Sequence, residues 1–266
     1  MPIGLLNGSH LVYQLTLLGL VGVCLSKFKD AQPKLCPTMN LTCLTPSLPA
    51  EKSVAAPAAG PTGVKWAFTA FMAVLVPVYW ANYGPTNFLY FCDAALFLAL
   101  IAVWTENALA ASMAAVGILI PQFVWCLDFG CELCGLHLTG MTGYMFDGQK
   151  SLFLRGLSFF HGWLPFLLLF LLKRLGYDKR ALPAWTALAW GLCLVAFFFL
   201  PAAGAVVADY NTPRNVDYVF GMSDDVPQHW LPPGLYLVVW MLALASAFYV
   251  PTHFALKRIF RSSAAR

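Results

Sequence analysis

Six long apolar segments limit the possible folds of this 266-residue chain more than any other feature. A helix needs about 20 mainly apolar residues, within a range of roughly 17–25, to cross the hydrocarbon core of a bilayer. A backbone in lipid must also satisfy its own hydrogen bonds, so each segment is expected to be helical. The segments are Val64–Ala81, Asn87–Thr105, Ala108–Leu127, Gly156–Leu172, Ala184–Leu200 and Gly234–Val250. The sequence therefore predicts an all-α fold, a polytopic bundle of six core transmembrane helices within residues 64–250.

The composition agrees with a membrane location. Apolar residues make up 60% of the chain and charged residues only 11%, whereas a soluble domain carries roughly 25% charged residues. A soluble chain with so few charges would expose large apolar patches, and a surface that faces lipid removes this restriction. Pro77, Pro121 and Pro165 fall inside the segments. We expect kinks there, because neighbouring helices can satisfy the backbone groups that proline frees.

The first 63 residues have a different character. Leu11–Leu25 is a seventh apolar stretch, with no charged residue before it and with Lys27 and Lys29 after it. This order does not fit a cleavable signal peptide. We interpret residues 1–25 as a possible additional membrane segment or signal anchor. Residues 26–63 are rich in Pro, Ala, Ser and Thr and are expected to form a flexible linker.

Lysines and arginines predict the orientation of the bundle. Four basic residues lie in the loop Lys173–Arg180, four lie in the tail 251–266, and Lys65 precedes the first core helix. Six helices place these three regions on one side, which the excess of basic residues assigns to the cytoplasm. The loops on the other side hold Lys150, Arg155 and Arg214. They also hold seven acidic residues: Asp128, Glu132, Asp147, Asp209, Asp217, Asp224 and Asp225.

Three polar residues lie inside the apolar segments, where an ionisable group costs at least roughly 2.5–3.5 kcal/mol and is a functional candidate. They are Asp93, Gln122 and His161. Each lies six residues, or about 9 Å at 1.5 Å per residue, from the expected outer end of its helix. Cys92 is next to Asp93. We expect these four side chains to lie at a similar depth in the outer leaflet.

This group of residues supports three hypotheses. In the first, Cys92 is a nucleophile for acyl transfer or hydrolysis of a lipid, His161 takes its proton, and Asp93 orients the imidazole or instead opposes thiolate formation. In the second, Asp93 and His161 form a proton relay in a transporter. In the third, the polar residues only hold helices together in a membrane assembly subunit. Membrane lipids are the expected partners, and a lipophilic molecule is the expected substrate.

A second group of candidate residues lies at the end of the third apolar segment and just after it. Cys126, Cys131, Cys134 and His137 provide the four ligands that a structural zinc site needs, but a disulfide or free thiols are the simpler interpretation on an oxidising face. The acidic loop around Asp224 is similarly interpreted as a solvated surface rather than a cation site. We expect no metal and no cofactor. No basic patch with interleaved aromatic residues indicates nucleic-acid binding.

Three segments within residues 85–175 resemble the YwaF-like family of bacterial integral membrane proteins. These are Leu89–Asp93, the helix from Val116 through Gln122 to Asp128, and Phe159–Gly162. The family is similar to eukaryotic six-helix acyltransferases of ether phospholipids and, more distantly, to six-helix lipid hydrolases. The resemblance implies a six-helix bundle with an embedded Cys92–His161 pair. The sequence departs from the family by aromatic residues before Cys92 and by a long loop, 201–233.

Overall fold

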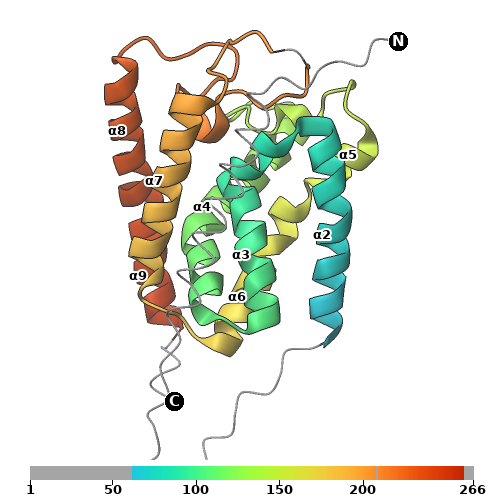
Figure 1. Cartoon of the computed structure of the whole chain (residues 1–266), viewed down its shortest axis with the longest axis vertical. Helices are drawn as coiled ribbons and strands as arrows, with labels where there is room; N and C mark the ends of the chain where they lie inside the picture. Colours follow the sequence, from blue (N-terminus) through green and yellow to red (C-terminus); the bar gives the residue numbers. More distant parts are fainter. Residues whose placement is uncertain (1–61, 208, 261–266) are drawn as a thin grey trace, which may run out of the picture. The chain divides into compact units, whose positions relative to one another are not determined.

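The computed structural model describes residues 62–207 and 209–260, and within this part of the chain the fold is all-helical (Figure 1). The expectations for residues 1–25 and 26–61 lie outside the described residues. The α-helices are α2 (Thr62–Tyr83), α3 (Phe91–Thr105), α4 (Ala108–Leu133), α5 (Leu152–Leu157), α6 (Phe160–Leu175), α7 (Ala181–Phe199), α8 (Pro233–Ala243) and α9 (Val250–Ile259). Short 3₁₀ helices cover Pro85–Leu89 (η1), Gly143–Met145 (η2) and Val216–Tyr218 (η3), and Leu244–Tyr249 (η4) is a π-helix.

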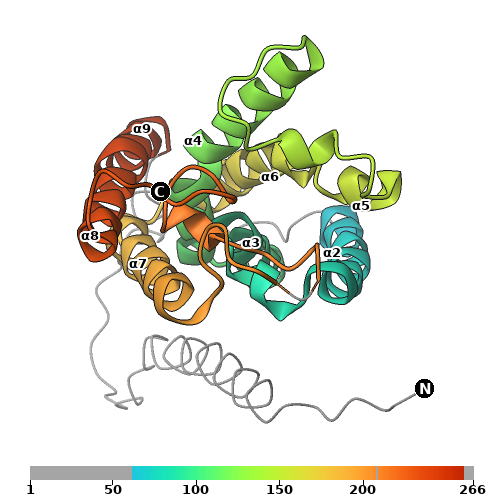
Figure 2. The same ribbon diagram turned by 90° about the horizontal axis from the view of Figure 1, so that it is seen from above.

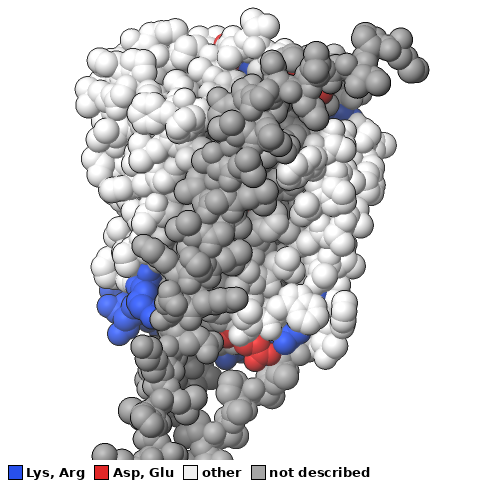
Figure 3. Space-filling view, in the orientation of Figure 1, with Lys and Arg blue, Asp and Glu red and all other residues white. Residues whose placement is uncertain are grey.

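Five helical stretches are long and apolar enough to cross a membrane: α2, α4, α5 with α6, α7, and α8 through α9. The sixth predicted span, α3, is shorter at 15 residues but is equally apolar. On the face visible in Figure 3, the charged residues that can be seen lie toward the two ends, and the described surface between them is drawn white, as other residues. The prediction of a polytopic helical membrane bundle is confirmed at the level of fold.

Helix α4 is the central helix of the bundle, since it packs against α3, α6, α7 and α9 and is the most buried of the spans. Its first half presents small side chains, and Ala111, Ala114 and Ala115 are fully buried. Small residues let helix backbones approach closely in lipid, where packing replaces the hydrophobic effect as the force that joins helices. At Gly117 there is no room for a side chain, because a Cβ there would overlap the ring of Trp185, which is fully buried.

The helices alternate in direction, so that all long loops lie at one end. The connections 84–90, 134–151 and 200–232 form this loop end. Seen along the bundle in Figure 2, α2 lies on one side and α8 and α9 on the other, with α3, α4, α6 and α7 between them. The opposite end carries Lys65, Lys173, Arg174, Lys179, Arg180, Lys257 and Arg258, and is called the basic end below. The chain therefore places its predicted acidic and basic regions at different ends.

Several helix boundaries differ from those expected. The predicted helix Asn87–Thr105 is split, because η1 ends before Tyr90 and α3 begins only at Phe91. Likewise, a break at Ser158 and Phe159 separates α5 from α6. Helix α4 runs six residues past Leu127, and α9 continues into the expected tail as far as Ile259. Apolar content does not mark such breaks, because the residues at them include the aromatic side chains of Tyr90 and Phe159.

Candidate functional site

Cys92 and Asp93 lie in the first turn of α3, not 9 Å inside a longer helix as the sequence had indicated. Asp93 is 3% exposed. Its Oδ2 accepts a hydrogen bond of 3.2 Å from Asn87 Nδ2 and a longer contact of 3.9 Å from the Cys92 thiol. Its Oδ1 has no hydrogen-bond partner among the described residues. The positive end of the helix dipole favours negative charge at both positions.

A second buried carboxyl group, that of Asp217, reaches the same helix start from the loop 200–232. Its Oδ1 accepts a hydrogen bond of 3.1 Å from the backbone N–H of Phe91, the first residue of α3. Its Oδ2 lacks a partner within the described ranges. Burial raises the pKa of Asp217 well above its ordinary value, the Phe91 N–H opposes this shift, and the charge of Asp93 adds to it. We expected Asp217 to belong to a solvated acidic loop, and the structure instead buries it.

The backbone around Asp217 adopts an unusual conformation. Asn215, Asp217 and Tyr218 have φ values of 50°, 58° and 61°, in the left-handed region that is costly for residues other than glycine. Side chains of α8 support the turn: Trp240 Nε1 donates to the Asp217 carbonyl at 2.8 Å, and Tyr236 donates to the Tyr218 carbonyl at 3.4 Å. These contacts hold the turn between α8 and the start of α3.

His161 and Gln122 lie in α6 and α4, and both are buried. The ring centroid of His161 lies 4.7 Å from that of Trp125, and its backbone carbonyl accepts a contact of 3.9 Å from the Cys126 thiol. In the described part of the chain, His161 Nδ1 and Gln122 Oε1 have no hydrogen-bond partner. No hydrogen bond joins Cys92 to His161 in residues 62–207 and 209–260. The structure thus brings together Cys92 and Asp93 but does not link them directly to the other two predicted residues.

Hydroxyl groups form a second polar network at the loop end. Tyr79 of α2 and Ser158, at the break before α6, share a hydrogen bond of 2.8 Å, and both are buried. Tyr144 of η2 accepts a hydrogen bond of 3.2 Å from Trp125 Nε1, the same tryptophan that lies against His161. Burial raises the pKa of Tyr144, and its hydrogen bonds with Ser158 and Trp125 oppose the shift. The sequence alone does not indicate these residues, because single tyrosine and serine side chains give no distinctive pattern.

The carboxylate of Asp128, near the end of α4, holds the loop that follows this helix. Its Oδ1 accepts hydrogen bonds from the backbone N–H groups of Thr139 and Gly140 and from the Thr139 hydroxyl, at 2.6, 3.3 and 2.8 Å. Its Oδ2 accepts two more from the N–H and hydroxyl of Thr142, at 2.9 and 2.6 Å. Every described interaction of this fully buried side chain is structural, so we assign it no chemical role.

The cysteine cluster at the end of α4 contains free thiols in the structure. Cys126 and Cys134 are exposed and Cys131 is half-buried. His137 Nδ1 lies 2.9 Å from Glu132 Oε2, so this candidate zinc ligand pairs with a carboxylate. Among the residues the structure describes, no three His, Cys, Asp or Glu side chains lie together as metal ligands would.

The fold and the buried polar residues at its loop end define a multi-pass helical membrane protein. The chain matches no family model, and it is similar to none of the curated proteins or solved structures with which it was compared.

Proposed function

We propose that this chain is a membrane-embedded thiol enzyme that transfers or hydrolyses the acyl group of a lipid, with Cys92 as the nucleophile. The observation that carries the proposal is the contact of 3.9 Å between the Cys92 thiol and Asp93 Oδ2 at the start of α3. A thiol reacts as its thiolate, and a helix N-terminus stabilises this form. A neighbouring carboxylate can accept the thiol proton, which makes Asp93 a nearer proton acceptor than His161.

In this reaction, Asp93 takes the thiol proton while the Cys92 sulfur attacks the carbonyl carbon of an acyl ester. The ester C–O bond breaks, the acyl group forms a thioester with Cys92, and the departing alcohol receives the proton from Asp93. Water or a second alcohol then takes the acyl group and regenerates the thiol. His161 supplies a second proton acceptor, because its Nδ1 has no partner in the described residues. The resemblance of residues 85–175 to the YwaF-like family implies a pair formed by Cys92 and His161.

Labelling of the purified full chain with an electrophile that carries an acyl chain tests this proposal. With labelling followed at the peptide that contains position 92, we expect strong labelling of the wild type, loss of labelling in Cys92→Ala, and slower labelling in Asp93→Asn and His161→Ala. Cys126→Ala is the matched control, because it removes an exposed thiol outside the proposed site. All variants should first give an unchanged helical spectrum and elution volume. Labelling that persists in Cys92→Ala, or that disappears in Cys126→Ala, would contradict the proposal.

The unpartnered carboxyl oxygens of Asp93 and Asp217 favour a second candidate function, a proton-coupled transporter. Buried carboxyl groups inside a membrane bundle commonly belong to proton pathways. The two functions separate in proteoliposomes with a pH-sensitive dye inside. A transporter predicts proton movement that Asp93→Asn abolishes and Cys92→Ala preserves. The enzyme predicts no proton movement in either protein.

We further propose that the basic end faces the cytoplasm, because most lysines and arginines of the described residues lie there. Tags placed at the C-terminus and within residues 176–180 should both be protected from the outside of intact cells. A tag in the loop 200–232 should be accessible there. If the C-terminal tag and the tag within residues 176–180 were found on opposite faces of the membrane, this result would contradict both the orientation and the number of membrane-spanning helices.

A further inference from the structure

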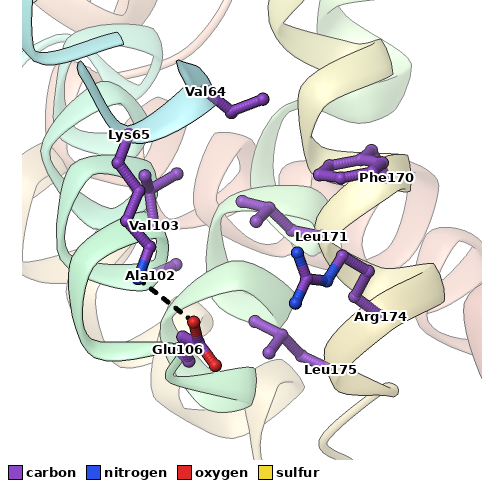
Figure 4. A pocket seen from close by; sticks show the side chains of 9 residues that line it. All are labelled: Val64, Lys65, Ala102, Val103, Glu106, Phe170, Leu171, Arg174 and Leu175. Carbon is purple, nitrogen blue, oxygen red and sulfur yellow. Dashed lines mark hydrogen bonds and ion pairs between the residues drawn. The ribbon is translucent and has the colours of Figure 1, made fainter. Parts of the chain in front are cut away.

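Within the described residues, the accessible thiols outside the Cys92 site lie at the end of α4. The pocket near the basic end offers no such group, because its walls are mostly apolar and its Lys65 and Glu106 pair with each other at 3.1 Å (Figure 4). At the end of α4, in contrast, Cys134 is exposed and Cys131 is half-buried. Figure 2 shows that this end of α4 extends outward beyond the neighbouring helices. Both thiols are therefore accessible to reagents in the surrounding medium.

The end of α4 places Cys131 and Cys134 in one helical turn. The backbone N–H groups of Cys134 and Leu136 both donate to the Cys131 carbonyl, each at 2.9 Å. Gly135 follows with a φ of 74°, a left-handed residue that commonly ends a helix. Helical residues three positions apart share one face, and their Cα atoms are about 5 Å apart. This separation lies within the range of roughly 4.4–6.8 Å that a disulfide spans.

The third cysteine of this cluster is too distant to join the pair. Cys126 precedes Cys131 by five positions, which in a helix separates the Cα atoms by about 9 Å, and cysteines more than roughly 7 Å apart cannot be bridged without backbone movement. A structural zinc site needs four ligands, and no three candidate ligands lie together in the described part of the chain. The geometry therefore favours a bond between Cys131 and Cys134 over the other arrangements of these thiols.

We propose that Cys131 and Cys134 form a dithiol site that exchanges with disulfides of the medium and closes to an intramolecular disulfide. Cys134 is the more exposed thiol. Its sulfur attacks one sulfur of the external disulfide and forms a mixed disulfide, while the other half leaves as a thiol. The Cys131 sulfur then attacks the Cys134 sulfur, and the second half leaves as a thiol. Two protein thiols are oxidised, one external disulfide is reduced to two thiols, and each leaving sulfur gains the proton that a protein thiol loses.

The place of the pair in the fold favours the closed form. Dithiol sites that oxidise other proteins lie at a helix N-terminus, which stabilises their reduced, anionic form. Cys131 and Cys134 instead lie at a helix C-terminus, where the dipole disfavours negative charge. The loop end also faces the oxidising side of the membrane in the orientation proposed above. The site is separate from Cys92, and its chemistry does not depend on the proposed enzyme activity.

Equilibration of the purified full chain with equal concentrations of reduced and oxidised glutathione tests the exchange. Acid quenching, alkylation of the remaining thiols and peptide mass spectrometry then report the state of each cysteine. In most wild-type chains we expect alkylation to be lost at both Cys131 and Cys134, which should be joined to each other. Cys126→Ser is the matched control, because it removes a neighbouring exposed thiol, and it should form the same disulfide.

Two further variants test the order of the steps. Cys131→Ser should accumulate glutathione on Cys134 well above the wild-type level, because no second thiol displaces it. Cys134→Ser should leave Cys131 without a bond to any protein thiol. Alkylation that persists at both positions in most wild-type chains would overturn the proposal, as would a bridge from Cys126 to either residue. Equal amounts of glutathione on Cys134 in the wild type and in Cys131→Ser would also overturn it, because Cys131 would then take no part in the exchange.

Discussion

Replacement of Asp128 by alanine should destabilise the loop end of the bundle by about 3 kcal/mol. The change leaves three backbone N–H groups without the acceptor that they have in the structure, those of Thr139, Gly140 and Thr142. The hydrogen bond from the Thr142 N–H is buried. Its loss therefore leaves an unsatisfied buried donor, which costs about 1–3 kcal/mol. The other two bonds are partly exposed, and water can replace them at a net cost of about 0.5–1 kcal/mol each.

The assay is unfolding of the purified chain in mixed micelles, followed by far-UV circular dichroism as the denaturing detergent fraction rises. Proteolysis of the loop 134–142 provides a local readout, and its rate should increase in Asp128→Ala. Asp128→Asn should have an intermediate effect, because its amide retains one acceptor oxygen. Asp147→Ala removes an acid from the same end whose hydrogen bonds from Gln149 and Tyr210 are exposed to solvent, and it should change stability by less than about 0.5 kcal/mol. A similarly small effect of Asp128→Ala would refute the structural role of this carboxylate.

Three further substitutions test the packing and the electrostatics. Gly117→Ala should cost about 1–3 kcal/mol, because the new methyl group overlaps the buried ring of Trp185; a stability equal to that of the wild type in the same assay would show that the two helices can separate freely. Burial raises the folded-state pKa of Asp217, so the folded chain binds more protons than the unfolded one above the ordinary pKa. Stability should therefore fall as pH rises from that value toward the folded pKa. Asp217→Asn should remove this decline, and a pH profile that is unchanged by the substitution would contradict the burial. Tyr177→Phe removes the buried hydrogen bond of 2.6 Å to His253 Nδ1 and should cost about 1–3 kcal/mol in the unfolding assay; no loss would indicate that water replaces the hydroxyl.

Much of the architecture could be predicted from local sequence properties. The apolar segments predicted where helices cross the bundle, and the positions of basic residues predicted which connections lie at the same end. Helix ends were less predictable. The split before Phe91 and the break at Ser158 occur inside continuous apolar stretches, so hydropathy does not detect them. These breaks matter for the site, because they place Cys92 and His161 in the first turns of their helices.

Only part of the candidate site could be predicted from the same local sequence properties. Asp93 and Cys92 are adjacent in the chain, so their proximity follows from the sequence. The relation of either residue to His161 depends on how α3 and α6 are rotated about their axes, which a single sequence does not specify. Tyr79, Ser158 and Tyr144 come from separate elements and form a network only in the folded bundle.

Segment length, hydropathy and charge are local quantities, and they suffice to define a helical membrane bundle with a basic end. The role of Asp217 is different, because this residue reaches the start of α3 across 126 positions of the chain. Its backbone conformation, its burial and its bond to Phe91 exist only when α3, α8 and the loop 200–232 pack together. From its sequence, a carboxyl group in a polar, glycine-containing loop is expected to be exposed to water. Only the tertiary structure determines whether elements distant in the chain pack over it and exclude the water.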